Sequence, residues 1–319
     1  MKKIFHCTLI IILIISCEKQ VSINQKYSDF QIDLTDLEKR NLYGKVQEYT
    51  LYITHFNESG KPQAENPKLI NKEIFTEFGS IQFLEDYDIN GEIKRSEAYF
   101  YDKNNKLTKT ITKIGPTTSV DLFKRDSINK TETRRLFVND IEMVKDIRIY
   151  GKNDKIIKEI EIRAVNGDTV VRNYNYKFDS NNNIIRYDFD TNNIDKKNTR
   201  EYKYDENGNM IQKIYYDAKN IRKINSEYKN NILTKIKEYK VSSDSTETLA
   251  YIKEYDKDYN VTSINVFKDS KLYRETKIEY VFDKFGNWIE KKTYTKRNYR
   301  GSNSFHLATL ATRKIKYWE

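Results

Sequence analysis

The feature that most constrains the fold is a repeated unit of about 26 residues that recurs through most of the chain. Its best-preserved copy is Lys277–Tyr294, which reads KIEYVFDKFGNWIEKKTY. Apolar and polar residues alternate on both sides of its turn, Asp283-Lys284-Phe285-Gly286-Asn287. Alternation interrupted by a turn of Asp, Gly and Asn predicts a β-hairpin. The unit is therefore interpreted as a structural building block that shows no catalytic site.

Weaker copies place further turns along the chain at a steady interval. From Gly151 to Asp283 successive turns are 28, 26, 24, 27 and 27 residues apart. A single hairpin is marginal in water, so each copy is expected to pair with the one before it. The expected fold is all-β: an elongated, twisted or coiled antiparallel meander of repeated hairpins. Because the chain contains only ten Gly and three Pro, Asn and Asp are expected to form most of the turns.

The repeat is broken in several places, where we expect long connections. The segment His55–Lys72 is interpreted as an irregular loop, and Gly115–Arg134 as one eroded hairpin with a long connection. Val241–Glu247 and Lys296–Thr312 are read as two further polar connections. We expect function, if it can be located, at three of these breaks: His55–Lys72, Gly115–Arg134 and Lys296–Thr312.

Both ends of the repeat region carry candidate caps. Thr35-Asp36-Leu37-Glu38 matches a capping box, which predicts a short N-terminal helix from Thr35 through about Leu42, closed near Gly44. Arg313–Trp318 is interpreted as a closing edge strand whose charges discourage edge-to-edge association.

The N-terminus has the pattern of an export signal. Lys2 and Lys3 precede the apolar run Ile4–Ile15, which is too short to span a bilayer. This signal pattern ends with Ile14-Ile15-Ser16-Cys17, which resembles a bacterial lipobox. The resemblance implies a signal peptide over 1–16 and lipidation of Cys17. A tether over 17–33 and a single β domain over 34–319 would follow. The alternative is an ordinary secretory signal with a chance Cys near its end.

Catalytic chemistry is not indicated by any motif. His55 and His306 are isolated, and no catalytic, metal or cofactor-binding residues can be assigned. The turns around Asp205 resemble calcium loops but lack the terminal bidentate Glu. We therefore expect no cofactor and no enzyme, although a glycosidase-like carboxylate pair stays open.

The charge and the tyrosines leave two questions of binding open. The net charge is +10, and removal of the signal with Lys2 and Lys3 lowers it to +8. Lys and Arg are interspersed with acids, so we favour a solvated mixed-charge face over an anion-binding surface. The chain contains 25 Tyr. Rows of Tyr with Lys could stack sugars or bases, but we interpret them as the packed face of the sheet.

The turn sequence resembles a known family. Tyr204-Asp205-Glu206-Asn207-Gly208-Asn209 and Phe282-Asp283-Lys284-Phe285-Gly286-Asn287 are similar to the YD repeats of Rhs proteins, over roughly Glu85–Tyr294. The resemblance implies a spiralling β-sheet, and in long members a shell around a toxin. This chain is shorter, and it looks more like the small YD-repeat lipoproteins of Gram-negative bacteria.

The expected function is that of a lipid-anchored protein of the bacterial cell envelope, with the outer membrane as the expected location. It would be a non-enzymatic binding or scaffold protein for a glycan or an envelope partner, with the membrane as its anchor and nucleic acid not expected. The ligand-binding residues stay unknown at this stage. The alternatives are an envelope carbohydrate-active enzyme and an Rhs-type toxin-associated or immunity protein.

Overall fold

A computed structural model describes residues 36–40, 42–151, 154–164, 166–192, 194–217, 220–297 and 304–319. The predicted signal (1–16), the tether (17–33), Cys17 and the N-cap Thr35 lie outside the described residues. The described part contains one helical turn, α1 (Asp36–Lys39), and twenty strands.

The strands follow one another along the chain as hairpins. They are β1 (Val46–His55), β2 (Lys68–Phe75), β3 (Ile81–Tyr87), β4 (Ile93–Tyr101), β5 (Leu107–Ile114), β6 (Thr117–Asp126), β7 (Thr131–Val138), β8 (Ile141–Tyr150), β9 (Ile156–Arg163), β10 (Thr169–Phe178), β11 (Ile184–Thr191), β12 (Ile194–Tyr204), β13 (Met210–Asp217), β14 (Asn220–Lys229), β15 (Ile232–Val241), β16 (Glu247–Tyr255), β17 (Val261–Lys268), β18 (Lys271–Phe282), β19 (Trp288–Arg297) and β20 (His306–Tyr317).

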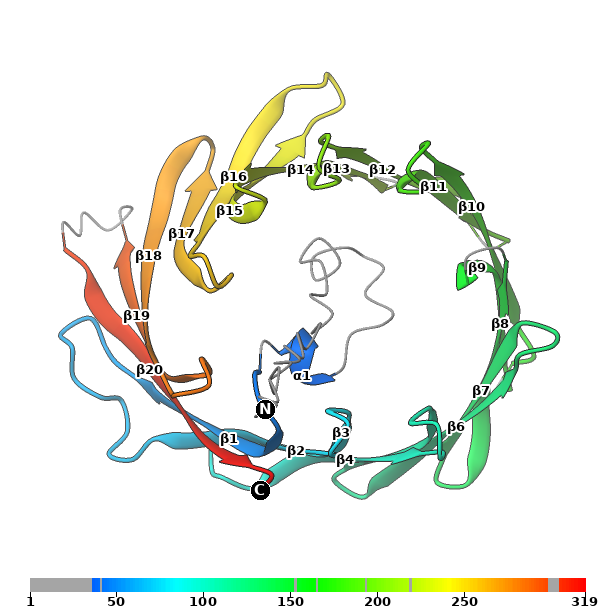
Figure 1. Cartoon of the computed structure of the whole chain (residues 1–319), viewed down its shortest axis with the longest axis horizontal. Helices are drawn as coiled ribbons and strands as arrows, with labels where there is room; N and C mark the ends of the chain where they lie inside the picture. Colours follow the sequence, from blue (N-terminus) through cyan, green and yellow to red (C-terminus); the bar gives the residue numbers. More distant parts are fainter. Residues whose placement is uncertain are drawn as a thin grey trace, which may run out of the picture.

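The sheet closes on itself into a barrel (Figure 1). Each strand pairs antiparallel with its neighbours in sequence, and β1 pairs with both β2 and β20. The predicted all-β antiparallel meander is confirmed, but its elongated or coiled open form is wrong. Strand twist accumulates until the first and last strands meet, and their pairing satisfies both free edges. The expectation that Arg313–Trp318 forms an edge strand is wrong for the same reason, since β20 pairs on both sides.

The barrel is wide enough to leave an open lumen. Twenty strands about 4.8 Å apart and tilted by about 40° give a diameter of about 40 Å. Side chains on opposite walls then leave about 20 Å clear at the axis. Few side chains are fully buried, and most of the apolar ones belong to two small clusters, one that includes Leu37 of α1 and one on β11 and β12.

Most copies of the Asp turn lie at one end of the barrel, which we call the Asp rim, although the copy at Asp88, after β3, lies at the opposite end. The Asp rim carries the turns that follow the even-numbered strands, and the other end is the far rim. In the turn after β12, the Asp205 carboxylate accepts hydrogen bonds from the backbone N–H groups of Asn207 and Asn209 at 3.0 and 2.8 Å. Gly208 has φ +78°, and Asn182 takes the equivalent place with φ 64° in the turn after β10. The predicted use of Asn and Asp in these turns is confirmed.

The helix α1 is shorter than predicted and packs beside β1 and β2. It spans four residues instead of reaching Leu42. The Leu37 N–H donates to the Gly79 carbonyl at 3.1 Å, and Leu37 and Leu42 are buried against Val46 and Phe75. The helix packs inside the ring of strands instead of capping a stack of hairpins (Figure 1).

Several predicted connections are strands in the structure. The loop expected over His55–Lys72 covers only 56–67, because β2 begins at Lys68. Gly115–Arg134 does contain a hairpin, formed by β6 and β7, but its expected long connection is wrong because the turn covers 127–130. The connection expected over Lys296–Thr312 is shortened by β19 and β20, and its residues 298–303 lie outside the described part. Val241–Glu247 is confirmed as a connection, at 242–246.

Candidate functional site

The two walls of the barrel carry different side chains because successive residues of a strand point to opposite faces. The face that carries Tyr49, Glu73 and Phe75 contacts α1, and α1 lies within the ring of strands (Figure 1). This face is the inner wall. The cross-strand registers extend the assignment around the barrel.

An ion-pair network covers the inner wall from β4 to β10. Several of its arginines contact two carboxylates each, and most of these ion pairs join neighbouring strands. The guanidinium of Arg134 lies 2.8 Å from Asp121 and 2.9 Å from Asp146. Arg172 lies 3.3 Å from Glu159 and 2.9 Å from Glu161. The described carboxylates of this region therefore serve to hold the wall, and their charges are matched.

Aromatic rings replace the ion pairs on the adjoining strands β10–β14. We call this surface the aromatic–cation patch, and it consists of Tyr174, Tyr176, Tyr187, Phe189, Tyr202, Tyr215, Arg200, Lys213 and Arg222. Neighbouring ring centroids are 5.6 Å apart for Tyr176 and Tyr187, and 6.4 Å apart for Tyr187 and Tyr202. The patch therefore forms a continuous row of packed rings across three strands, in which Tyr187 and Tyr202 are buried.

Three cations lie over the ring of Tyr215 at the edge of this row. Lys213 Nζ is 4.6 Å from the ring centroid, and the guanidinium carbons of Arg222 and Arg200 are 4.7 and 4.9 Å from it. A cation within about 6 Å of a ring centroid is attracted by the ring face. The patch therefore combines flat apolar faces with hydrogen-bond donors.

Burial raises the pKa of two tyrosines of the patch, Tyr174 and Tyr176. Burial, followed by the nearby Glu159 carboxylate, raises the pKa of Tyr174 to about 12. Burial also raises the pKa of Tyr176, whose hydroxyl donates to the Ile156 carbonyl at 3.0 Å. These hydroxyls remain hydrogen-bond donors at neutral pH.

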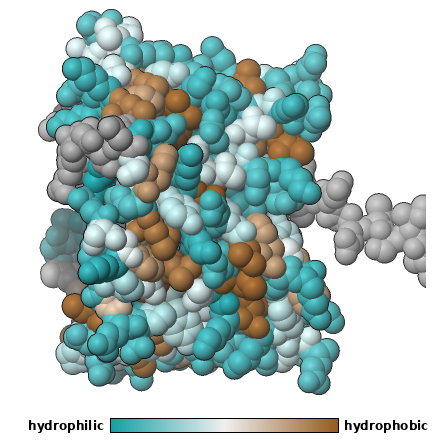
Figure 2. Space-filling view, turned by 90° about the vertical axis from the view of Figure 1, so that its left-hand side faces the viewer, coloured by the Kyte–Doolittle hydropathy of each residue, from teal (hydrophilic) through white to brown (hydrophobic). Residues whose placement is uncertain are grey.

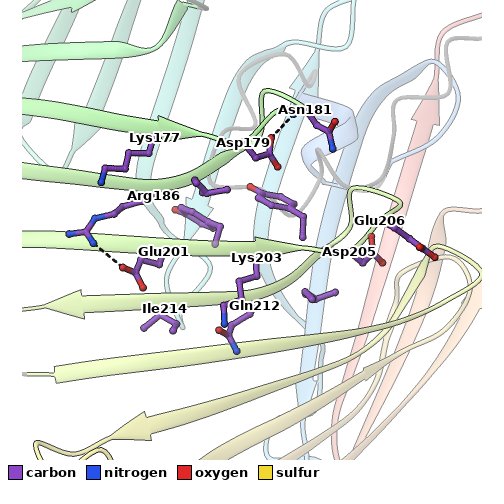
Figure 3. A pocket seen from close by; sticks show the side chains of 14 residues that line it. Lys177, Asp179, Asn181, Arg186, Glu201, Lys203, Asp205, Glu206, Gln212 and Ile214 are labelled. Atoms are coloured by element: carbon purple, nitrogen blue, oxygen red, sulfur yellow. Dashed lines mark hydrogen bonds and ion pairs between the residues drawn. The ribbon is translucent and has the colours of Figure 1, made fainter.

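A shallow groove of about 750 Å³ lies on the outer wall of the same strands, next to the Asp rim (Figure 3). Its lining includes Lys177, Arg186, Glu201 and Gln212. The Arg186 guanidinium lies 3.1 Å from Glu201, so the two charges that cross the groove neutralise each other. The groove is open, and its Arg186 and Glu201 charges are paired, so we take the inner patch as the stronger candidate site.

The structure does not gather the predicted functional breaks into one site. Two of them adjoin at the far rim, where Arg297 lies 2.8 Å from Glu58 in the loop after β1. His55 and His306 also lie at the far rim, at the end of β1 and the start of β20. The third break, Gly115–Arg134, is part of the barrel wall.

The aromatic–cation patch was missed because its residues belong to the repeat and not to the breaks. The signal was present as period-two pairs, Tyr174 with Tyr176 and Lys213 with Tyr215. We interpreted such rows as the packed face of a sheet. That interpretation holds for Tyr187 and Tyr202, which are buried in one cluster, although no second sheet lies against the inner face of these strands (Figure 1).

Neither a candidate metal cluster nor a membrane-spanning helix occurs in the described part of the chain. It contains no group of three or more His, Cys, Asp or Glu that could hold a metal ion. Among the same residues, no helix has the length and hydrophobicity needed to cross a membrane.

Comparison with known proteins finds similarity only among solved structures. No family model and no curated protein matches the chain. A porin-like protein from Bacteroides uniformis aligns over 85% of this chain and 96% of its own, with 7% identity and a TM-score of 0.33. One from Bacteroides vulgatus aligns over 72% and 96%, with 9% identity and a TM-score of 0.23.

The complex TcdB2-TccC3-Cdc42 contains a third similar chain. It aligns over 81% of this chain but only 19% of its own length, with 11% identity and a TM-score of 0.26. The barrel is defined by the strand pairing within this chain itself.

Proposed function

We propose that the protein is a lipid-anchored, non-enzymatic binding protein of the bacterial cell envelope that holds a glycan against its inner wall. The observation that carries the proposal is the aromatic–cation patch. Sugar rings present flat C–H faces that pack on aromatic side chains, while their hydroxyls accept hydrogen bonds from Arg, Lys and Tyr. A lumen about 20 Å across admits an extended glycan chain.

The outer wall supports attachment to the membrane through the lipid and not through the strands. Ion pairs lie at outward-facing strand positions, with Lys235 3.0 Å from Glu254 and Lys296 3.0 Å from Glu275. A wall facing lipid carries an apolar band at such positions. Figure 2 shows a largely hydrophilic surface with separate hydrophobic patches on the side of the barrel that faces its viewer.

The relationship to small YD-repeat lipoproteins belongs to the same proposal. Its support is the Asp turn, which is built alike in several copies. In the turn after β18, the Asp283 carboxylate accepts from the N–H groups of Phe285 and Asn287, both at 2.9 Å. The same pair of bonds forms at Asp205 and Asp179.

A matched pair of variants on one strand tests the glycan site. Tyr215→Leu removes a ring from the inner wall, while Tyr216→Leu removes the next ring, which lies on the outer wall and donates to Glu201 at 3.1 Å. Using Cys17→Ser protein, a glycan array identifies a ligand and calorimetry measures its affinity. We expect Tyr215→Leu to weaken binding about tenfold and Tyr216→Leu to leave it unchanged. A protein that binds no glycan, or two variants with equal losses, would contradict the proposal.

The lipid anchor is tested separately from the ligand. Globomycin blocks cleavage of lipoprotein signals, so treated cells should accumulate a precursor that retains residues 1–16. Cys17→Ser should release the protein from the membrane fraction. Normal processing in the presence of globomycin would remove the anchor from the proposal and leave the glycan site to its own test.

A further inference from the structure

Two cations of the inner wall lie near the ring of Trp288, on strands across the barrel from the aromatic–cation patch (Figure 1). Lys291 belongs to β19 and Arg313 to β20, and both share the ring of Trp288. The Arg313 guanidinium carbon is 3.6 Å from the ring centroid of Trp288, and Lys291 Nζ is 5.3 Å from it. The ring thus holds two like charges close together.

The guanidinium of Arg313 carries N–H donors that have no hydrogen-bond acceptor. Its Nε and Nη1 atoms are buried and have no hydrogen-bond partner. Burial lowers the pKa of Arg313 to about 10, and burial together with the charge of Arg313 lowers the pKa of Lys291. A buried donor left unsatisfied is costly, and more so when it is charged.

The nearest carboxylate is already engaged elsewhere. Glu73 forms an ion pair with Arg40 and accepts a hydrogen bond from the Tyr49 hydroxyl at 2.8 Å. The other titratable groups that face Arg313 are Tyr49 itself and Tyr280, both neutral at physiological pH, with pKa values raised to about 12. The pair of cations therefore lacks a negative charge of its own.

We propose that Lys291 and Arg313 form a binding site for an oxyanion, a carboxylate or a phosphate group, on the inner wall. A group with two or more oxygens bridges the ammonium of Lys291 and the guanidinium of Arg313, which suits bidentate contact. Lys291 and Arg313 are both only partly buried as residues, although Nε and Nη1 of Arg313 are buried. The site does not depend on the glycan proposal, because it shares no residue with the aromatic–cation patch.

The test compares anions at constant ionic strength on full-length protein in detergent. Inorganic phosphate and acetate each replace chloride, and calorimetry and the melting temperature report binding. Phosphate and acetate distinguish the two sources of oxyanion. We expect saturable binding of at least one, with a rise in melting temperature. A melting temperature and heat signal no different from those in chloride would overturn the proposal.

Two substitutions give the test its specificity. Lys291→Met should weaken anion binding by about tenfold, since it removes one charged donor. In chloride alone it should melt no lower than the wild type, because it also removes a repulsion. Lys314→Met is the matched control: Lys314 follows Arg313, and its Nζ lies 5.1 Å from the Tyr52 ring centroid on the outer wall. It should leave anion binding unchanged. Equal binding by wild type and Lys291→Met would overturn the proposal.

Discussion

A single asparagine joins the N-terminal segment to the barrel wall. Asn287 is fully buried in the turn between β18 and β19. Its side-chain oxygen accepts from the Tyr43 N–H at 2.6 Å, and its amide nitrogen donates to the Tyr43 carbonyl at 2.8 Å and to the Tyr317 hydroxyl at 2.7 Å. One amide thereby satisfies the backbone groups of a residue 244 positions away in sequence.

Replacement of Asn287 by Ala should therefore cost more than replacement of the same position in another copy. Asn183 occupies the equivalent place after β10, and its side chain donates only to Asp179 of its own turn, at 3.0 Å. We expect Asn287→Ala to lower the free energy of unfolding by roughly 3 kcal/mol and Asn183→Ala by roughly 1 kcal/mol. Urea denaturation of both variants measures the difference. Equal losses would show that the contact with Tyr43 contributes nothing.

The sequence predicts the turn around Asn287 but not the special role of the residue. Asp283, Gly286 and Asn287 follow the same local chemistry as Asp205, Gly208 and Asn209, so pattern alone finds the turn. The partner Tyr43 lies far away in sequence, and no local rule selects it. The same limit applies to Lys291 and Arg313, whose proximity depends on the register between β19 and β20.

The helical element α1 contributes mainly by packing. Leu37 and Leu42 lie 8% and 4% exposed in the cluster that also holds Val46 and Phe75. Arg40 adds an ion pair with the buried Glu73. A helix of four residues has no stability of its own, so these tertiary contacts hold it in place.

Truncation of Leu42 should expose the contribution of this packing. We expect Leu42→Ala to lower the free energy of unfolding by about 3 kcal/mol, from lost burial and the cavity left behind. Ile211→Ala is the control, since Ile211 is 37% exposed on the outer wall, and it should cost less than about 1 kcal/mol. Guanidinium denaturation measures both. A loss at Leu42 no larger than that at Ile211 would mean that the packing of the segment after α1 does not stabilise the barrel.

At the level of elements, the hairpins were predictable and the closure was not. Alternation and Asp turns mark most strands, because both are local properties of sequence. The hairpin of β6 and β7 was predicted only in part, because the turn between the two strands has no Gly. The pairing of β1 with β20 depends on the sum of twist over twenty strands, which no single unit encodes.

The whole barrel carries neutral tyrosines on several of its strands. Burial is the first cause of the shift in each of six tyrosines whose pKa is raised to about 12: Tyr49, Tyr87, Tyr174, Tyr228, Tyr280 and Tyr317. A pKa raised above the ordinary 10.0 means that folding favours the protonated form. Their contribution to stability is complete below pH 10 and is lost as the pH rises towards 12.

The barrel should therefore lose stability in alkali through many sites at once. We expect the free energy of unfolding to fall steadily between pH 10 and pH 12. Arg313 slightly opposes this loss of stability. Its pKa is lowered to about 10, so the folded state becomes more stable as its guanidinium loses a proton. Ultraviolet absorbance of tyrosinate, with urea-unfolded protein as the reference, follows the titration. Native tyrosines that ionise near pH 10 without loss of stability would contradict this expectation.

Closure also means that the barrel has no fixed first strand. The Trp318 N–H donates to the Lys45 carbonyl at 2.8 Å, so the segments that flank β1 and β20 lie side by side at the Asp rim. Circular permutation should exploit this: a flexible linker of about ten residues joins Glu319 to Asp36, and new ends open in the exposed turn at 242–246. Every strand then keeps both neighbours, and the permutant should show the same far-ultraviolet spectrum and a cooperative melt. Failure to fold would show that the order of synthesis, and not only the final pairing, determines how the barrel closes.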